Sequence, residues 1–356
     1  MTGIAIIGAG IYGAYAAKKL SSVPGLEITL ISKKYYINFV PSVPRNFVTQ
    51  DLNGYSRALE EVFGDSVRLI YDEAVSFDES KVTTRKNGDV AFDVLIVATG
   101  SILSREFELP DTVDSAIEHF TKEFEQVQRA KNITVIGGGI SGCELTGELA
   151  HNFKDEIAKG EKRINLIHSS TNVLSNNEVD SVRRSVQSQL EDMDVKLYLG
   201  QRATLDGDKV YVGSEEVPTD HIIWTTGVKP NTPDSPLEGL KNEKGEIKVK
   251  PTFQTLASPN IFAIGDCVNF VIKAVAPLKK WNSVLVDNVI AFAQNKPLTK
   301  QVVPPTENDK PTCGVSLGPE HGAGQLATPF GTFPMPAFLV VQAKSKTMFK
   351  GKLSEL

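Results

Sequence analysis

The chain has 356 residues, enough for two or three domains. Hydrophobic residues make up 41% of it and charged residues 23%, as in ordinary globular proteins. A formal net charge of −5 gives no support for a nucleic-acid partner, and no apolar run is long enough to cross a bilayer.

Cysteine usage argues against two kinds of site. The three cysteines, Cys143, Cys267 and Cys313, are widely separated, with neither a CxxC nor a CxxxxC pair. The spacing therefore predicts neither a redox dithiol nor a zinc site, and we expect no metal. A sparse, odd number of cysteines is typical of a reducing compartment. The first predicted strand begins by Ile4, which leaves no room ahead of it for a cleavable targeting segment, so we expect a cytoplasmic protein.

A glycine-rich turn near the start of the chain predicts a dinucleotide site. The apolar residues 4–7 lead into Gly8-Ala9-Gly10-Ile11-Tyr12-Gly13, and a helical pattern continues to Ser22. This is G-x-G-x-x-G between a strand and a helix. The first glycine allows the tight turn, the second lets the backbone approach a pyrophosphate, and the third lets the helix pack on the strand. Unpaired N–H groups at the helix start then face the phosphates.

The second predicted strand, residues 26–31, ends in an unusual way. Many dinucleotide sites place Asp or Glu at this end to bind the ribose hydroxyls. Here the residue is Ser32, followed by Lys33 and Lys34. A serine can still form a hydrogen bond, and a nearby cation can contact phosphate. Residues 35–50 are predicted to be irregular, and Arg45 within them is either a pyrophosphate or flavin contact or a solvated loop cation.

A meander and a buried strand complete this first unit. We expect a strand over residues 67–71 and a meander over 72–92 that turns at Asn87-Gly88. Residues 92–100, FDVLIVATG, read as a buried strand ending in Ala98-Thr99-Gly100. The small residues at its end let the loop backbone come close to a cofactor.

The same pattern then occurs a second time. An apolar run at 133–136 leads into Gly137-Gly138-Gly139-Ile140-Ser141-Gly142, followed by a helix over 143–153 and a strand over 163–168. A second meander is expected over 195–211, and TDHIIWTTG, ending at Thr226-Gly227, matches FDVLIVATG. Two such units in the same order predict two dinucleotide sites.

A third motif follows the repeat. An apolar strand at residues 260–264 ends in Gly265-Asp266, and a helical pattern follows after a short loop. Asp266 is either the hydrogen-bond partner of a sugar-like polyol or an ordinary helix N-cap. The two glycine loops upstream favour the polyol.

With these motifs the chain resembles the FAD- and NAD(P)-dependent pyridine nucleotide-disulfide oxidoreductases. Within that superfamily it resembles the apoptosis-inducing-factor-like group, which includes the ferroptosis-suppressor quinone reductases, and it is similar to type II NADH dehydrogenases. The closer markers are residues 166–169, 314–319 and 324–325. The resemblance implies an α/β fold with two Rossmann-like domains, β-meander insertions and a short C-terminal segment. It also implies FAD at the first unit and Gly265-Asp266, and NADH or NADPH at the second unit.

The expected domain division follows from the order of the motifs. A discontinuous FAD-binding domain takes residues 1–115 and 248–305, and an NAD(P)H-binding domain takes 116–247. Residues 306–356 form a C-terminal segment on the acceptor or membrane side. The absence of a redox dithiol argues against disulfide-reductase chemistry.

The candidate cofactor-binding residues come from the glycine loops, the strand ends and the Gly-Asp motif. They are Gly8, Ala9, Gly10, Tyr12, Gly13, Ser32, Lys33, Arg45, Ala74, Ala98, Thr99, Gly100, Gly137, Gly139, Ile140, Ser141, Gly142, His168, Thr226, Gly227, Gly265 and Asp266.

Two residues are candidates for a catalytic role. The resemblance places Glu144, expected in the first turn of the second glycine-loop helix, near the nicotinamide. The alternative is a glutamate that merely favours a helix N-terminus, an interpretation that fits Glu148 better. Lys273 follows the Gly-Asp motif and lies either near the flavin or acceptor, or in solvent.

The resemblance implies hydride transfer from NAD(P)H to FAD and electron transfer to a quinone-type acceptor. The alternative is an apoptosis-inducing-factor-like flavoprotein with a signalling or binding role and slow NADH oxidation. His168-Ser169-Ser170 at the end of the second unit's second strand has neither an acid nor an arginine cluster, and only the resemblance favours NADH.

The C-terminal residues 338–352 mix apolar side chains with lysines, Lys344, Lys346, Lys350 and Lys352. They form either a peripheral membrane contact, where a quinone is available, or a terminal element packed on the core with a solvated basic tail. As family-based alternatives to a purely cytoplasmic protein, the resemblance suggests the mitochondrial outer membrane or a lipid droplet.

Overall fold

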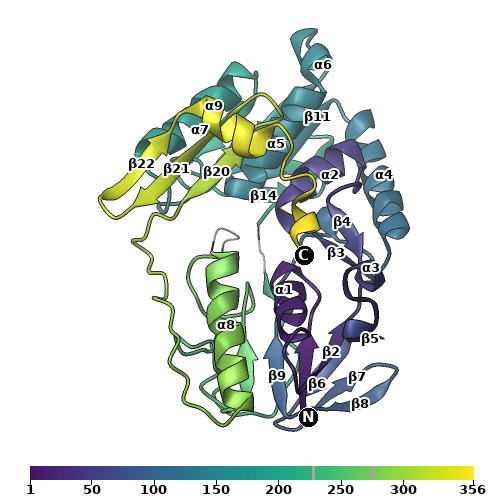
Figure 1. Cartoon of the computed structure of the whole chain (residues 1–356). Coiled ribbons are helices and arrows are strands. Elements are labelled where there is room, and N and C mark those ends of the chain that lie inside the picture. Colours follow the sequence, from purple (N-terminus) through teal and green to yellow (C-terminus); the bar gives the residue numbers. More distant parts are fainter. Residues whose placement is uncertain (227–228, 274–276) are drawn as a thin grey trace.

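Two parallel β-sheets, one in each half of the sequence repeat, form the frame of the molecule (Figure 1). The computed structural model describes residues 1–226, 229–273 and 277–356. The first sheet has the strand order β19-β9-β1-β2-β5, and the second has the order β13-β12-β11-β17. Neighbouring strands in both sheets are parallel. The predicted α/β class with two Rossmann-like units is confirmed.

The first unit is built on apolar strands covered by helices, as parallel sheets require. Its strands are β1 (Thr2–Ile7), β2 (Leu26–Ser32), β5 (Arg68–Tyr71), β9 (Val94–Val97) and β19 (Ile261–Ala263). Helices α1 (Ile11–Leu20) and α8 (Leu278–Ala293) pack against each other, and Tyr12 stacks on Trp281 with the ring centroids 6.3 Å apart. Pairing of β19 with β9 brings the third sequence motif into this unit.

The second unit repeats this arrangement with its own helices. Its strands are β11 (Asn132–Ile136), β12 (Arg163–His168), β13 (Lys196–Leu199) and β17 (His221–Trp224). Its helices are α4 (Val113–Arg129), α5 (Ile140–Asn152), α6 (Lys154–Ala158) and α7 (Asp180–Asp192). The strand predicted at 163–168 is confirmed.

The repeat is visible in individual backbone hydrogen bonds. The Gly8 N–H donates to the Ile31 carbonyl, and the Gly137 N–H donates to the Ile167 carbonyl, each at 2.9 Å. At the closing strands, Ala98 N–H donates to Ile7 (2.8 Å) in the same way that Thr225 N–H donates to Ile136 (3.0 Å). The two sequence units therefore fold into two equivalent strand–loop–helix cores.

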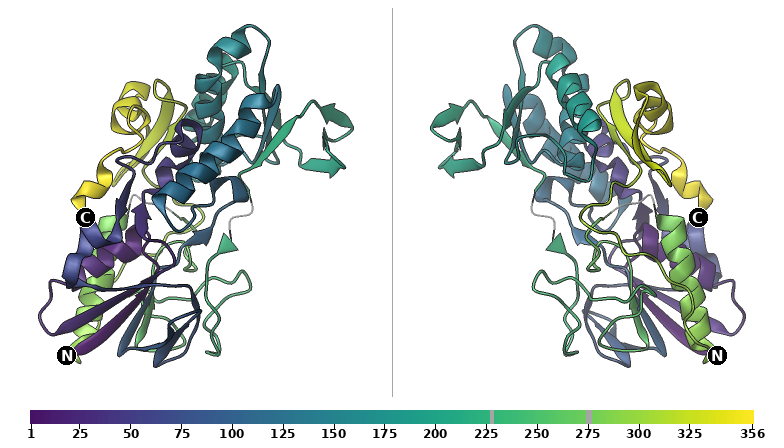
Figure 2. Two further views of the ribbon diagram at one scale, coloured as in Figure 1. Left: turned by 90° about the vertical axis from the view of Figure 1, so that its right-hand side faces the viewer. Right: turned by 90° about the vertical axis from the view of Figure 1, so that its left-hand side faces the viewer.

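Each unit also carries an antiparallel meander. The first contains β6 (Ala74–Phe77), β7 (Lys81–Thr84) and β8 (Gly88–Ala91), and the second contains β14 (Ala203–Asp206), β15 (Lys209–Val212) and β16 (Glu215–Val217). Figure 2 shows the second meander projecting away from the body of the molecule. The prediction that this meander begins at residue 195 is wrong, because β13 pairs in parallel with β12 and so extends the second sheet.

The stretch predicted to be irregular, residues 35–50, is mostly regular. It contains β3 (Tyr36–Asn38), a 3-10 turn (Val40–Ser42) and α2 (Val43–Thr49), and it is followed by β4 (Ser56–Ala58), α3 (Leu59–Phe63) and a further 3-10 turn (Gly64–Ser66). Pro44 lies in the first turn of α2, where its missing N–H costs no helical hydrogen bond. Phe47 of α2 packs edge-on against Phe120 and Phe124 of α4. Helix α2 is therefore held by the core that surrounds the second sheet.

Two short strands accompany the chain where it passes between the two sheets. β10 (Ser101–Ile102) pairs with β18 (Lys229–Pro230) in antiparallel fashion. The Asn231 N–H donates to the Gly100 carbonyl at 2.9 Å. A 3-10 turn (Arg105–Phe107) then leads to α4. These hydrogen bonds hold the loop at residues 98–100 against the segment at residues 229–231, which leads from the second unit back to the first.

The C-terminal segment crosses both units (Figure 1). It contains the antiparallel sheet β20 (Cys313–Ser316), β21 (Gly322–Thr328) and β22 (Gly331–Met335), then α9 (Ala337–Val340), a π-helical turn (Val341–Ser345) and a 3-10 turn (Lys352–Glu355). The sheet contacts α5 and α7, whereas Leu353 joins the core of the first unit. The C-terminal segment thus contacts both units and links them, in addition to the β10–β18 pair.

Asp72 fastens the first meander, and its substitution tests that role. Its buried carboxylate accepts the backbone N–H groups of Lys86 (2.7 Å) and Asn87 (2.8 Å) at the predicted Asn87-Gly88 turn. Burial alone would raise the pKa of Asp72, but these hydrogen bonds hold it well below its usual range. We expect Asp72→Ala to lower the free energy of unfolding by about 1 kcal/mol at pH 7.

The pH dependence of this loss gives the check. Because the folded-state pKa is depressed, the contribution is present above the unfolded-state value of about 3.9 and is lost as the pH falls below it. Urea unfolding of the two proteins at pH 7 and pH 3.5 should show a difference that shrinks at the lower pH. Asp65→Asn, at an exposed carboxylate, is the control. An equal loss at both pH values would contradict the assignment.

Candidate functional site

The first glycine loop crosses the end of β9 with no room for a side chain. Gly8 has φ = +100°, and a Cβ there would lie 2.5 Å from the Ala98 carbonyl oxygen. A Cβ on Gly13 would overlap the Gly8 carbonyl. By contrast, nothing lies within 4 Å of a Cβ on Gly10. The loop is therefore pressed against Ala98 on one side and open on the other.

The open side leads to the start of α1. Gly10 is the N-cap of this helix, no side chain caps it, and its first turn carries no acid. The first N–H groups of a helix have no partner within it, and the helix dipole adds partial positive charge. This combination fits a bound pyrophosphate.

The Gly-Asp motif closes the same site. A Cβ on Gly265 would lie 3.3 Å from the Tyr12 ring, so the motif lies directly beside α1. Ser101 Oγ donates to Asp266 at 3.1 Å, and burial raises the pKa of this carboxyl. The helix N-cap interpretation of Asp266 is wrong, because α8 begins at Leu278 with Pro277 as its N-cap.

The residues at the end of β2 form a closed turn. Ser32 Oγ donates to the Lys34 carbonyl (2.8 Å) and accepts the Lys34 N–H (3.1 Å). Ser32 is buried, Lys33 is exposed, and burial lowers the pKa of Lys34 to about 8. The hydroxyl predicted to replace the ribose anchor is thus already used within the chain.

Four further candidates belong to the first unit, and three of them directly follow its closing strand, β9. Ala98 contacts it directly, and the Thr99 carbonyl accepts a long hydrogen bond (3.5 Å) from Asn231. Gly100 takes φ = +68° before β10, and Ala74 begins β6. Asn38, which sequence reasoning missed, ends β3, a strand that packs against α1. Within the described part of the chain both polar atoms of its buried amide lack a partner, which fits a bound polar group.

The second glycine loop has the same construction. Gly137 has φ = +122°, and its Cβ would lie 2.5 Å from the Thr226 side chain and 2.6 Å from Thr225 Oγ1. Gly139 faces open space as the uncapped N-cap of α5, whose first turn carries no acid and contains Ile140 and Ser141. A Cβ on Gly142 would overlap the Gly137 carbonyl oxygen. Gly227 lies outside the described residues. A second pyrophosphate fits here.

His168 ends β12 and lies against this loop. A Cβ on Gly138 would lie 2.8 Å from the imidazole, and the Gly138 N–H donates to His168 Nδ1 at 3.1 Å. The accepting Nδ1 places the proton of a neutral ring on Nε2, and burial lowers the pKa of the ring. His168 therefore supports the loop as a neutral side chain.

Lys273 takes part in a local ion pair. Its Nζ is 3.0 Å from Glu246 Oε1 and donates to the Val268 carbonyl. The side chain ties the loop after Gly265-Asp266 to the chain around Glu246, and the residue remains exposed to solvent, as one of the two interpretations expected. A catalytic role for Lys273 stays a prediction.

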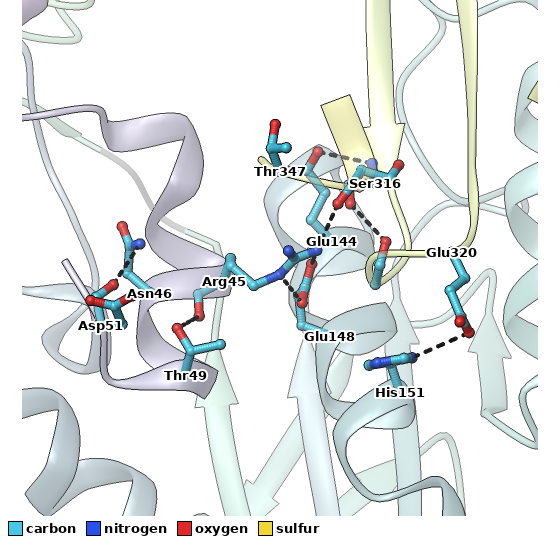
Figure 3. Close-up of polar contacts among 12 residues, drawn as sticks. Arg45, Asn46, Thr49, Asp51, Glu144, Glu148, His151, Ser316, Glu320 and Thr347 are labelled. Carbon is cyan, nitrogen blue, oxygen red and sulfur yellow. Dashed lines mark hydrogen bonds and ion pairs between the residues drawn. The ribbon is translucent and has the colours of Figure 1, made fainter. Parts of the chain in front are cut away.

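Arg45 is not the loop cation expected from the sequence. It lies on α2, where Nε is 2.5 Å from Glu148 Oε2 and Nη2 is 2.7 Å from Oε1 (Figure 3). Nη2 also donates to the Ser345 carbonyl at 2.9 Å. The guanidinium is buried and committed to protein partners, which differs from both a solvated cation and a pyrophosphate contact.

Glu144 and Glu148 are both buried on α5, with exposed fractions of 3% and 2%. Glu144 is the fifth residue of the helix, past its first turn, and Glu148 lies near the middle, so neither is a helix N-terminal glutamate. Glu144 Oε1 lies 2.6 Å from Lys344 Nζ. The same oxygen accepts the Ser316 N–H at 3.1 Å (Figure 3). Sequence reasoning missed these partners, because Lys344 reads as part of a basic tail.

Among the residues that the structure describes, no three His, Cys, Asp or Glu side chains gather as a metal site requires. Burial raises the pKa values of the Cys143 and Cys267 thiols. In the same part of the chain, no helix has the length and apolar character to cross a membrane.

The fold and the two glycine loops define a protein that binds two dinucleotides. Comparison with known proteins agrees. The family model described as "Pyridine nucleotide-disulphide oxidoreductase" matches residues 2–295. Apoptosis-inducing factor 1 of Saccharomyces cerevisiae is 33% identical over 99% of this chain and 97% of its own length. Ferroptosis suppressor protein 1 of Homo sapiens is 26% identical over 97% of this chain and 93% of its own.

Solved structures show the same fold. The sulfide:quinone oxidoreductase of Aquifex aeolicus superposes with a TM-score of 0.80 at 19% identity, covering 100% of this chain and 91% of its own. NDH2 of Plasmodium falciparum in complex with NADH gives 0.71 at 16% identity, covering 99% and 94%. The chain belongs to the pyridine nucleotide-disulphide oxidoreductase family, in its apoptosis-inducing-factor-like group. Its cofactors are FAD and NADH or NADPH, which the two open loops fit.

Gly8 offers a direct test of the first loop. We expect Gly8→Ala to abolish FAD retention, because the Cβ would strike the Ala98 carbonyl and displace the start of α1. The flavin absorbance of the purified protein measures this. Gly25→Ala is the matched control, because Gly25 also has a positive φ (+84°) but nothing lies within 4 Å of its Cβ. That variant should keep FAD and lose about 1 kcal/mol of stability. Retention of FAD by Gly8→Ala would contradict the assigned site.

Proposed function

We propose that this chain is an FAD-dependent NAD(P)H:quinone oxidoreductase that works at a membrane surface. Family membership establishes an NAD(P)H-dependent flavoprotein oxidoreductase. The proposal adds the quinone and the membrane. The observation that carries it is an apolar patch on the C-terminal segment, which packs on the nucleotide helix α5.

The C-terminal apolar patch consists of large side chains that face solvent: Leu326, Phe330, Phe333, Phe338 and Leu339. Phe330, at the tip of the β21–β22 hairpin, is 92% exposed, and Phe338 on α9 is 66% exposed. Leu326 and Phe333 face each other across the hairpin. Exposed apolar clusters mark interaction sites, and a lipid surface that holds a quinone fits this one.

The far C-terminus contributes less to such a surface than its sequence suggests. Met348 and Leu353 are buried, so they cannot reach lipid. Lys344 is paired with Glu144, Lys350 with Asp51 and Lys352 with Glu355. The tail after α9 therefore packs on the core, and the hairpin and α9 are the candidate membrane contacts.

The residues of the chain have distinct tasks in the proposed reaction. The starts of α1 and α5 hold the two pyrophosphates, and Asp266 lies where it can bind a polyol hydroxyl. When bound, the flavin accepts a hydride from the nicotinamide and passes electrons to the acceptor. Overall, NAD(P)H, a proton and a quinone give NAD(P)⁺ and a hydroquinone. We place Glu144 near the nicotinamide.

We propose NADH as the donor. Neither an acid nor an arginine follows β12, where His168 supports the loop and Ser169 and Ser170 come next. The position has neither the arginine that accommodates a 2′-phosphate nor the acid that binds the ribose of NADH, so the choice of NADH follows the family resemblance. The NADH named with the Plasmodium NDH2 structure is in keeping with this choice.

The second candidate is a signalling flavoprotein. The names of the apoptosis-inducing factor relatives favour it. A DNA-binding role would need a basic surface, and a net charge of −5 does not supply one.

An anaerobic titration separates the two functions. We expect NADH to bleach the flavin faster than NADPH, and a soluble quinone to restore the oxidised spectrum, because both half-reactions belong to turnover. Ferricyanide and a dithiol substrate serve as comparison acceptors. Slow bleaching with no reoxidation by quinone would overturn the proposed enzyme and favour the signalling protein.

Vesicle binding tests the C-terminal apolar patch. We expect the double variant Phe330→Ser, Phe338→Ser to lose co-sedimentation with phospholipid vesicles, because it removes two of the most exposed apolar anchors. Leu205→Ser, at a 49% exposed side chain on the second meander, should bind as the unmodified chain does. Equal binding by all three proteins would contradict a membrane contact through this patch.

A further inference from the structure

Two buried carboxylates distinguish α5 from its counterpart in the first unit. Glu144 and Glu148 are one helical turn apart on the same face of α5. When the two glycine motifs are aligned, they correspond to Tyr15 and Lys19 of α1. Tyr15 is only partly buried and Lys19 is exposed. A glycine-loop helix therefore does not need these carboxylates to hold a dinucleotide.

Each carboxylate is matched by a cation from a different part of the chain. Glu148 binds Arg45 of α2, and Glu144 binds Lys344 of the C-terminal π-helical turn. Lys344 Nζ also donates to the Gly314 carbonyl at 2.8 Å. Three segments far apart in sequence thus meet on one face of α5.

Arg45 does more than neutralise Glu148. Its Nη2 also donates to the carbonyl of Ser345, the residue after Lys344. A simple ion pair would not need this contact. Because Ser345 is completely buried, the hydrogen bond fixes the backbone from which the Lys344 side chain leaves.

The C-terminal sheet packs closely against the same face of α5. A Cβ on Gly147, between the two glutamates, would lie 2.5 Å from Leu317 Cα. The Ser316 N–H reaches Glu144 Oε1, the oxygen that Lys344 also binds. Within the described part of the chain, both of these contacts go to Oε1, and none to Oε2 is found.

We propose that Arg45 is a positioning residue that acts through Lys344. It holds the π-helical turn on α5, and the turn holds Lys344 on Glu144 Oε1, so that Oε2 keeps a fixed direction. The link to turnover rests on the proposed function, in which Glu144 lies near the nicotinamide. The mechanical link between Arg45 and Lys344 does not depend on it.

The test removes both charges of the Arg45–Glu148 pair together. The variant Arg45→Met, Glu148→Met leaves no unpaired buried charge, and such replacements are often neutral or stabilising. The matched control is Glu73→Met, Arg85→Met, which removes a surface ion pair with a 2.8 Å separation. Lys344→Met and the combination of Lys344→Met with the Arg45–Glu148 variant complete the set.

Stopped-flow reduction of the FAD-loaded proteins by NADH is the first readout. We expect the Arg45–Glu148 variant to lower the limiting reduction rate about tenfold while the Kd for NADH changes less than about twofold, because a misplaced group slows the reaction without weakening distant contacts. Lys344→Met should likewise lower the limiting reduction rate and leave the Kd for NADH nearly unchanged. The combined variant should be no slower than Lys344→Met alone, since effects through one residue are not additive. Additive losses, or a full rate in the Arg45–Glu148 variant, would overturn the proposal.

Limited trypsin cleavage is the second readout and needs no turnover. Cleavage after Lys344 should be about tenfold faster in the Arg45–Glu148 variant than in the unmodified protein or the surface control, whereas cleavage after Lys33 should be unchanged. Unchanged cleavage after Lys344 would refute the mechanical link. Faster cleavage in a protein whose flavin NADH cannot reduce would confirm that link and refute only the proposed function. If the Arg45–Glu148 variant does not fold, Arg45→Lys is measured in the same way. A lysine keeps a positive charge for Glu148 but lacks the second nitrogen that donates to the Ser345 carbonyl.

Discussion

The structure depends on one steric constraint that occurs twice. In each unit the turn after the first strand crosses the end of the closing strand so tightly that no side chain fits between them. Gly8 meets the Ala98 carbonyl, and Gly137 meets Thr225 and Thr226. This contact fixes the start of the following helix, and the helix start supplies the N–H groups that a pyrophosphate needs. The sheet order, the small residues at the strand ends and the position of Gly265-Asp266 all serve this geometry.

The two units differ in what covers their glycine-loop helices. Helix α1 packs against α8, whereas α5 lies between α2 and the C-terminal sheet. The α1 surface carries aromatic packing through Tyr12 and Trp281, and the α5 surface carries buried charge. The two units therefore share the glycine-loop core and differ in the side chains that cover its helix.

Local patterns were enough to predict the frame and the two loops. The strand–glycine–helix units, the Asn87-Gly88 turn and the strand at Arg163–His168 are fixed by neighbours in sequence. Helix α2 was missed because Pro41 and Pro44 suggested a loop, although a proline in the first turn, as Pro44 is in α2, suits a helix. The partners of Arg45 and Lys344 could not be predicted, because Glu148 and Ser316 lie far away in the chain and no local spacing marks them. A lysine in a basic tail looks the same whether it is solvated or buried.

The buried ion pairs are poor contributors to stability, which makes their arrangement informative. Bringing a charge out of water costs several kcal/mol, and well-packed apolar residues often replace such pairs at no loss. We infer that the pairs select one packing arrangement over others, because any arrangement that leaves a carboxylate of α5 buried without its cation costs free energy. In the structure Lys344 reaches Glu144 while the Ser345 carbonyl meets Arg45, and we infer that these contacts favour this position of the C-terminal segment on α5. On this inference the charges select the position of the C-terminal segment, and the apolar core, which includes Leu353, stabilises it there.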